Sequence, residues 1–447
     1  MAFNFKTANV GVRESRLGSV TGFVGDLETL VYRSECGSLK NRERCFSQSS
    51  SCLSGCALNQ VAGIRNVAIV YHAPSGCAAL ATSGDSRRKQ LAEKINRTTN
   101  TVYVCTDLNE QDTVFGAVEA LRKAIQYTWD KFHPDALFIA SSCVSGVIGE
   151  DIDGLVEELK DEYPVPVISM HCEGFKSRIW ASGFDISDHA VMQGIVKPPK
   201  EKRRVINIKN FYESHRPQIT KIFNEVFDAE PQFLYLNSTI EELSHLSESL
   251  ATVCICGTLG TYLGNALEET YGVPYVRTIN HSGIAGFEAW LRGIAKAIGK
   301  EKEAEAYIEK NRAIYLPQIE EVTKSLHGLR AVIGMGPGFT YEIARVLQEF
   351  GIKVEYALAW HYDYKYDNGD VPPALEHLLK TSPKDMKVAV ADQQNYEVLN
   401  ILQRYKPDLY FSRHPGTTVW AIKQGVAAVY VADEYTVFGY EGTLSFA

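Results

Sequence analysis

Short apolar runs rich in β-branched residues alternate with longer amphipathic stretches along nearly the whole chain. Runs that are apolar at every position are typical of parallel strands covered by helices on both faces. The first series of runs lies at 66–74, 101–107, 136–143 and 165–172. Further runs lie at 203–211, 232–237, 251–257, 273–279, 330–336, 353–360, 387–393, 408–414 and 427–433.

Residues 112–132 have apolar positions at helical spacing, which predicts one helix with Asp112 as its cap. A charged, proline-bearing linker at 197–204 and the end of a long amphipathic helix near His327 separate the series. The pattern therefore predicts an α/β fold with three Rossmann-like, doubly wound domains around a central site. The predicted boundaries are an N-terminal arm at 1–50 and domains at 51–200, 201–327 and 328–447.

Composition excludes several classes of function. A formal charge of −8 and a pI near 5.8 argue against a nucleic-acid surface. The first 26 residues lack the apolar segment of a signal peptide, and no long apolar run occurs, so we expect a cytoplasmic protein without membrane spans. The Gly-Lys in 293–301 has the wrong spacing for a Walker A motif and is assigned to a helix end. If ATP is used, another chain must hydrolyse it.

The chain has 10 cysteines, and without signs of secretion they indicate metal binding more than disulfides. Cys52, Cys77 and Cys143 stand in glycine-rich loops beside predicted strand ends, and Cys256 closes a later strand. Loops at the carboxyl ends of parallel strands are where α/β proteins build their sites. Three other thiols lie in apolar runs that favour simple burial, namely Cys105, Cys172 and Cys254. Cys36 and Cys45 are assigned no role.

Several motifs resemble those of the component-one proteins of nitrogenase and its relatives. The first motif runs from Cys52 through Cys56 and Gly63 to the His-Ala-Pro-Ser-Gly-Cys segment at 72–77. The others are the segments 101–116, 142–152 and 171–175, and Cys256 followed by 268–275. Weaker similarities lie at 334–338, 361–367 and 439–442, so the resemblance spans roughly residue 45 to the end.

The resemblance implies two metal sites. Cys52, Cys77 and Cys143 match the cysteines that bind an interfacial iron–sulfur cluster of the P-cluster type, shared with a paralogous β-type subunit in an α2β2 complex. Thiolates suit this role because soft sulfur ligands select iron–sulfur clusters. Cys56 remains a rival to Cys52, and both a four-iron and an eight-iron cluster stay open.

Cys256 matches the cysteine that anchors the nitrogenase-type iron–sulfur cofactor, whose heterometal the sequence leaves open. A buried strand-end thiol is the alternative. Gly336 and Gly338 match the cofactor's glycine loop, although the arginine expected there is missing. No histidine stands near the C-terminal Gly-Tyr-Glu-Gly motif, where only Asp433, Glu434 and Tyr435 occur. His414 is therefore the candidate second ligand, with an ordinary loop histidine as the alternative.

The segment after 171–175 departs from dinitrogen-reducing enzymes. Those enzymes place a histidine and a glutamine in the segment that corresponds to 176–185, where this chain has the aromatics Trp180 and Phe184. With Phe339 they predict a pocket for a small apolar substrate. His361, on the loop after the strand at 353–360, is a candidate proton donor, with a solvated loop residue as the alternative. His189 is interpreted as an ordinary helix residue.

Among the branches of the family, the chain is most similar to the α-type subunit of nitrogenase-like methylthio-alkane reductases. This implies reductive cleavage of a carbon–sulfur bond to give methanethiol and a hydrocarbon, with electrons from a separate ATP-dependent iron–sulfur reductase dimer. Three alternatives stay open: a dinitrogen-reducing subunit, a scaffold for cofactor assembly, and a tetrapyrrole reductase.

Overall fold

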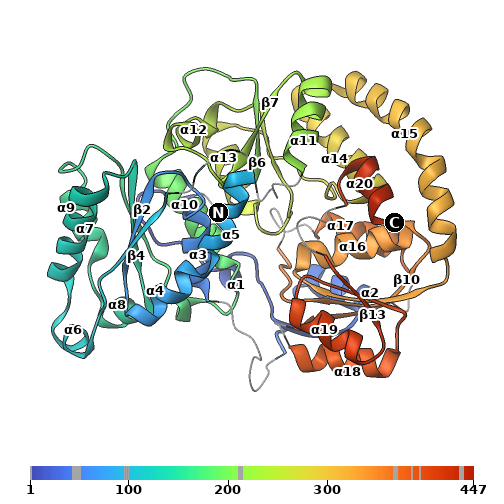
Figure 1. Ribbon diagram of the computed structural model, residues 1–447, viewed down its shortest axis with the longest axis horizontal. Coiled ribbons are helices and arrows are strands. Elements are labelled where there is room, and N and C mark those ends of the chain that lie inside the picture. The colour runs from blue at the N-terminus through green and yellow to red at the C-terminus, as the bar shows by residue number, and fades with distance from the viewer. Residues whose placement is uncertain are drawn as a thin grey trace.

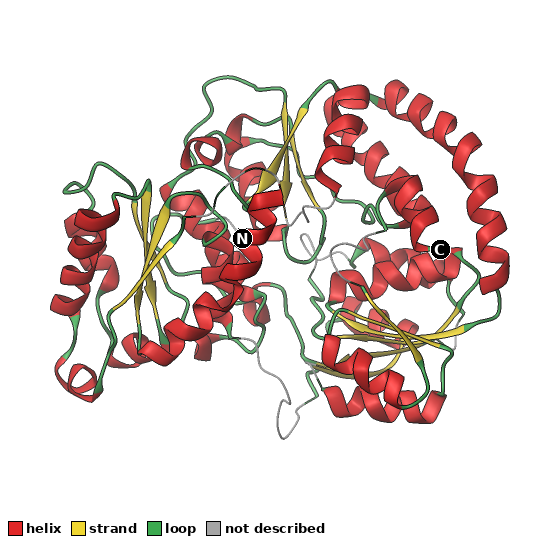
Figure 2. Cartoon of the chain, viewed as in Figure 1, coloured by secondary structure: helices red, strands yellow, loops and turns green. Residues whose placement is uncertain are grey.

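The computed structural model describes residues 3–42, 52–94, 96, 98, 100–209, 215–365, 371–383, 386–391, 394–431 and 437–447. Cys45, Asp433, Glu434 and Tyr435 lie outside the described residues. The chain forms three separate β-sheets flanked by helices, one at the left of Figure 1, one at the top and one at the lower right. Figure 2 shows the same layering of helices on sheets. The predicted α/β class with Rossmann-like domains is confirmed.

The first sheet has parallel strands in the order β3-β2-β4-β5. Their bounds are β2 Val67–His72, β3 Val102–Cys105, β4 Ala136–Ser141 and β5 Val167–Met170. Helices pack on both faces, so alternate strand side chains enter two different cores. One face is covered by α3 (Leu53–Val61) and α10 (Ser182–Gly194), the other by α7 (Val118–Phe132) and α9 (Ile152–Leu159). This double burial explains why the strands are apolar at every position.

The helix predicted at 112–132 is two helices, α6 (Glu110–Phe115) and α7. The chain breaks at Gly116, whose φ of 83° lies in the region that favours glycine. Asn109, not Asp112, is the cap of α6, because its side chain accepts hydrogen bonds from the amides of Gln111 and Asp112. The remaining helices of this region are α4 (Ser75–Ala81), α5 (Asp85–Lys94) and α8 (Cys143–Ile148).

The second sheet has parallel strands in the order β7-β6-β8, with bounds β6 Val205–Lys209, β7 Glu230–Leu234 and β8 Ala251–Cys254. The run at 273–279, predicted as a strand, makes only one bridge, between Thr252 and Tyr275. Pro274 has no amide hydrogen with which to extend the ladder. The helices here are α11 (Arg216–Ile222), α12 (Ile240–Ser244), α13 (Thr261–Tyr271), α14 (Gly283–Ile298) and α15 (Glu301–Thr323). The Gly-Lys at 299–300 follows the end of α14, as predicted.

The third sheet has the order β1-β11-β10-β9-β12-β13, and only β1 is antiparallel to its neighbour. Its strands are β1 Gly22–Asp26, β9 Arg330–Met335, β10 Lys353–Ala359, β11 Lys387–Ala391, β12 Leu409–Ser412 and β13 Ala427–Tyr430. The N-terminal residues are therefore not a separate arm, since β1 and α2 (Leu27–Glu35) belong to this last sheet and its core. The other helices are α16 (Pro337–Glu349), α17 (Pro373–Thr381), α18 (Asn395–Tyr405), α19 (Pro415–Lys423) and α20 (Gly439–Phe446).

Helix α10 joins the first sheet to the other parts of the chain through buried charges. Asp188 is fully buried and accepts hydrogen bonds from Lys209 Nζ at the end of β6 and from the Tyr235 hydroxyl, the latter at 2.6 Å. Asp185, one turn earlier, pairs with Arg13 of α1 (Arg13–Arg16) at 2.8 Å. Because buried ions must be paired to be tolerated, these contacts fix α10 against elements distant in sequence. Within the described residues, no helix has the length and apolar content needed to cross a membrane.

The Lys209–Asp188 pair predicts an asymmetric response to substitution. Lys209→Met leaves a buried carboxylate without its cation and is expected to cost about 3–5 kcal/mol of stability. The double variant Lys209→Met/Asp188→Leu removes both charges and is expected to recover most of that loss. Urea unfolding midpoints of the two variants test this, and a double variant less stable than Lys209→Met would contradict the pairing argument.

Candidate metal centres

Three thiols meet at the carboxyl edge of the first sheet. Cys52 immediately precedes α3, Cys77 lies in α4 after β2, and Cys143 opens α8 after β4. A Cβ on Gly174 would lie 2.9 Å from Cys52 Sγ and 3.4 Å from Cys143 Sγ, so the two sulfurs face the same space. Helix α4, which carries Cys77, packs against α3, the helix that follows Cys52. Burial raises the pKa of Cys77, and the charges of Cys143 and Cys52 raise it further.

Cys56 does not join this group. It lies one helical turn along α3, and its Cβ faces Gly183 of α10, where an added methyl would approach it to 2.7 Å. Cys56 is buried in an apolar cluster, and burial raises the pKa of its thiol. Cys36 is exposed, Cys105 is half-buried, and Cys172 and Cys254 are buried as predicted.

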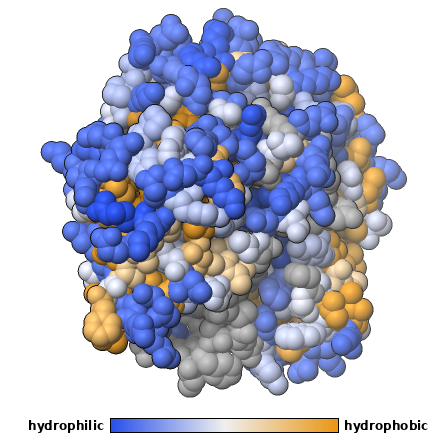
Figure 3. Space-filling view, turned by 60° about the vertical axis from the view of Figure 1, so that its left-hand side comes forward, coloured by the Kyte–Doolittle hydropathy of each residue, from blue (hydrophilic) through white to orange (hydrophobic). Residues whose placement is uncertain are grey.

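The three thiols open toward the surface. Cys77 is exposed, and Cys52 and Cys143 are partly exposed. Large apolar side chains stand exposed on the same elements: Phe115 on α6 at 86%, Val147 on α8 at 75%, and Phe175, beside Gly174, at 57%. Helices α6 and α8 pack together. Much of the face in Figure 3 is hydrophilic, with apolar groups in separate places. Exposed apolar side chains on two packed helices, such as Phe115 and Val147, favour a contact with another protein.

A polar network lies behind these thiols. His171 bonds to Asp153 Oδ1 at 2.9 Å and to Glu173 Oε1 at 3.4 Å, and these two contacts raise the pKa of His171 to about 9. Burial acts to raise the pKa of Glu173, but its bonds to His171 and Lys176 outweigh burial and lower it to about 2. The charge-assisted bonds of His171 to two carboxylates therefore fix the segment that carries Gly174.

Cys256 forms a second, interior site. It lies two residues beyond β8, is 2% exposed, and has its Sγ 3.5 Å from Thr258 Oγ1. A Cβ on Gly338, in the first turn of α16, would lie 2.7 Å from that sulfur. The carboxyl ends of β8 and β9 therefore meet here, and only glycine at 338 leaves the sulfur its space. Burial raises the pKa of Cys256.

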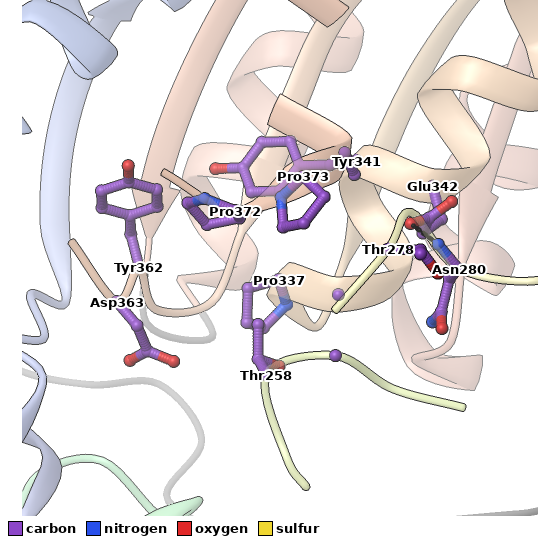
Figure 4. Close-up of a pocket in the computed structure, with 13 residues that line it drawn as sticks. Thr258, Thr278, Asn280, Pro337, Tyr341, Glu342, Tyr362, Asp363, Pro372 and Pro373 are labelled. Carbon is purple, nitrogen blue, oxygen red and sulfur yellow. Dashed lines mark hydrogen bonds between the residues drawn. The ribbon is translucent and has the colours of Figure 1, made fainter. Parts of the chain in front are cut away.

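A pocket adjoins this site (Figure 4). Tyr362 and Asp363 lie at one end, Glu342 and Asn280 at the other, and Pro337 and Thr258 lie between them. The lining also includes Gly257 and Gly338, the neighbours of the Cys256 sulfur. The Tyr341 hydroxyl is buried here without a hydrogen-bond partner among the described residues. A buried polar atom of this kind favours a ligand or bound group in the pocket.

Two of the three residues predicted to form an aromatic pocket lie together in a packed apolar cluster. The rings of Trp180 and Phe184 are 5.6 Å apart and pack with Cys56, Ile179, Ala181 and Leu259. The Leu259 amide donates to the Cys256 carbonyl at 3.1 Å, which ties this apolar cluster to the cysteine loop. Phe339 is not part of it: the Arg413 guanidinium lies 4.4 Å from its ring, and it packs on the third-sheet core. Residue 339 follows Gly338 on a helix, so its side chain leaves in another direction.

The two candidate histidines differ in their surroundings. His361 is buried, not a solvated loop residue, and its Nε2 lies 3.7 Å from Asp363 Oδ2. Burial lowers the pKa of His361, so the ring is neutral at pH 7. His414 follows β12 and lines a different pocket, with Trp360 and Tyr410. His189 is a buried helix residue whose Nε2 and Nδ1 bond to Thr7 and Tyr262.

The structure also places residues at the site that the sequence analysis missed. Arg13, Asp185 and Asp363 form a buried ion cluster beside His361, and the charge of Arg13 acts on the Cys256 thiol. No sequence pattern predicted a role for Arg13 at the site, because it lies in the weakly periodic N-terminal region. Among the described residues, no three ligand side chains are gathered closely enough for a single metal ion.

Comparison with known proteins identifies the family. The family model of nitrogenase component 1 type oxidoreductases matches residues 52–447. The chain belongs to this family. It is 25% identical to the nitrogenase molybdenum-iron protein alpha chain of Methanosarcina barkeri, over 88% of this chain and 84% of that protein. It is 26% identical to the nitrogenase iron-molybdenum cofactor biosynthesis protein NifE of the same organism, over 85% and 82%. The solved structure "Nitrogenase Cp1 at pH 6.5" has the same fold, with a TM-score of 0.74 at 22% identity over 91% of this chain and 89% of that one.

Two glycines separate the two sites experimentally. Gly174→Ala would crowd the Cys52 sulfur and is expected to deplete iron bound at the first site, whereas Gly338→Ala would crowd the Cys256 sulfur and deplete metal at the second. Gly11→Ala is the control, because its added methyl would meet only Ser15 Oγ at 3.6 Å. Metal analysis and electron paramagnetic resonance of the anaerobically purified complex provide the readout. Identical losses in both variants would contradict the assignment of two separate sites.

Proposed function

We propose that the chain is the catalytic α-type subunit of a nitrogenase-like reductase that cleaves the carbon–sulfur bond of small methylthio-alkanes. The observation that carries this proposal is the apolar wall beside the Cys256 loop. Trp180 and Phe184 pack together there with Leu259. Dinitrogen-reducing enzymes place polar side chains in the corresponding segment. An apolar wall favours a thioether over dinitrogen, which needs polar groups to accompany its protonation.

Cys52, Cys77 and Cys143 are proposed to hold an interfacial iron–sulfur cluster of the P-cluster type. The common space faced by Cys52 and Cys143 supports this choice over Cys56, whose thiol is buried elsewhere. The thiols are also open to a surface that carries exposed Phe115, Val147 and Phe175. This surface suits a paralogous β-type subunit that supplies the remaining thiolates, in an α2β2 complex.

Cys256 is proposed to anchor a nitrogenase-type iron–sulfur cofactor, with Gly336 and Gly338 leaving room for it. The buried thiol and the space that a Cβ on Gly338 would fill both fit such a group. When bound, the cofactor would supply the electrons for reductive cleavage. The heterometal stays open.

The residues around Cys256 have distinct proposed tasks. Trp180 and Phe184 exclude water and hold the alkyl groups of the substrate. His361, whose Nε2 lies 3.7 Å from Asp363 Oδ2, takes up a proton from solvent and passes it to the substrate. The overall reaction consumes two electrons and two protons, breaks one C–S bond, and releases methanethiol and a hydrocarbon. The electrons come from a separate ATP-dependent iron–sulfur reductase dimer, in a cytoplasmic complex.

A second candidate function is a scaffold on which a nitrogenase cofactor is assembled. The chain is 26% identical to a NifE and 25% identical to an alpha chain, and this close agreement in identity favours a scaffold as the second candidate. A scaffold would bind metal at both sites but would not turn over a thioether.

Turnover decides between these functions. The anaerobic complex with its ATPase is expected to convert ethyl methyl sulfide to methanethiol and ethane, with little ammonia from dinitrogen. Cys256→Ala is expected to lower this rate more than about 100-fold, since it removes a covalent anchor. Cys254→Ala, a buried strand thiol two residues away, is the matched control. A Cys256→Ala complex with full activity would refute the catalytic role, and metal binding without any turnover would favour the scaffold.

A further inference from the structure

Residues 13–20, which we call the N-terminal clasp, lie outside the region matched by the family, which begins at residue 52. The clasp contains α1, and Figure 1 places α1 between the first and third sheets. Two segments of the site contact it. One is 177–185, which carries Trp180 and Phe184, and the other is 361–363, which begins with His361.

The clasp holds the first segment on both sides of Trp180. The Glu14 carboxylate accepts hydrogen bonds from the amide of Arg178 at 2.8 Å and from the Ser177 hydroxyl at 2.7 Å. On the other side, the Arg13 amide donates to Ser182 Oγ at 3.1 Å, and the Arg13 guanidinium makes two bonds to Asp185, at 2.8 and 3.2 Å. The backbone that presents Trp180 and Phe184 is therefore tied at both ends to the clasp.

The second segment is held by the same residues from the opposite side. Arg13 Nη1 donates to Asp363 Oδ2 at 3.2 Å, and the Ser19 hydroxyl also donates to Asp363. Val20 and Tyr362 exchange backbone hydrogen bonds of 2.9 and 3.0 Å. His361 therefore lies beside the Asp363 carboxylate and the Tyr362 backbone, both of which are hydrogen-bonded to the clasp.

Arg13 is the centre of this arrangement. Its side chain is fully buried and bridges two carboxylates from distant parts of the chain, which only a planar, multidentate cation does well. Burial acts to raise the pKa of Asp185, but Arg13 and Arg16 outweigh it and lower the value, so Asp185 stays ionised. Without Arg13, the buried carboxylates of Asp185 and Asp363 would have less positive charge beside them, and the two segments would separate.

We propose that the N-terminal clasp is a working part of the site, in which Arg13 and Glu14 are positioning residues that hold Trp180, Phe184 and His361 around Cys256. The clasp couples the apolar wall to the histidine loop through Arg13, which bonds to both Asp185 and Asp363. Its effect on substrate rests on the proposed function, but its effect on the two segments does not.

Hydrogen–deuterium exchange in the full, anaerobically purified complex tests the proposal without turnover. Glu14→Ala is expected to raise exchange about ten-fold in peptides covering 177–181 and to leave 361–365 unchanged, because the hydrogen bonds of the Glu14 carboxylate go to residues 177–179. Arg13→Lys keeps the positive charge but loses the planar guanidinium that bonds to two carboxylates, and is expected to raise exchange in both segments. Lys6→Ala, an exposed cation of the same region, is the control.

Hydrogen exchange in strand β4, residues 136–141, measures the stability of the fold as a whole. Faster exchange confined to the clasped segments supports the proposal. Unchanged exchange at 177–181 in Glu14→Ala, or an equal increase in 136–141, would overturn it. If the Arg13→Lys complex fails to assemble, Glu14→Ala alone decides, because Glu14 is only partly buried.

Kinetics add a readout that a purely structural role would not move. Glu14→Ala is expected to raise KM for ethyl methyl sulfide about ten-fold with kcat changed less than about two-fold, since the wall binds substrate without entering the chemistry. A fall in kcat at constant KM would contradict this role. A wild-type complex that turns over no thioether would sink the proposed function yet leave the exchange result intact.

Discussion

Buried carboxylates on one helix determine how the three sheets surround the site. Asp185 and Asp188 lie one turn apart on α10, and both are fully buried. Each is neutralised by a cation from elsewhere, Arg13 from the N-terminal region and Lys209 from the second sheet. Since an unpaired buried charge costs several kcal/mol, neither contact can be lost cheaply. The space around Cys256 is therefore set by ion pairs as well as by apolar packing.

The same helix links the two candidate metal sites. Gly183 lets α3 approach α10 closely, because any side chain there would strike Ala57 and Cys56. Helix α3 begins after Cys52 at the first site and carries Cys56 into the apolar cluster beside Leu259 and the second site. About one helical turn, roughly 5 Å, thus separates a residue of each environment. Helix α3 therefore runs from the surface thiol Cys52 to the apolar cluster that packs against the Cys256 loop.

Much of this was predictable from the sequence because the signals are local. Apolar runs gave the parallel strands, and Gly338 and Cys256 follow strand ends that meet in the fold. The remainder depends on contacts between distant residues. Strand β1 is short and contains two glycines, so it carries no clear pattern until it pairs with β11. Arg13 belongs to the site because it pairs with Asp185 and Asp363, which are distant in sequence. Phe339 does not join Trp180 and Phe184, because its position on helix α16 directs its side chain elsewhere.

The central claim is that separate thiols of this chain hold iron in two centres. Iron-edge anomalous diffraction from crystals of the anaerobically purified complex tests it most directly. The account predicts one group of iron peaks bonded to Cys52, Cys77 and Cys143 at a subunit boundary, and a second bonded to Cys256. Anomalous maps without iron at these sulfurs would contradict it.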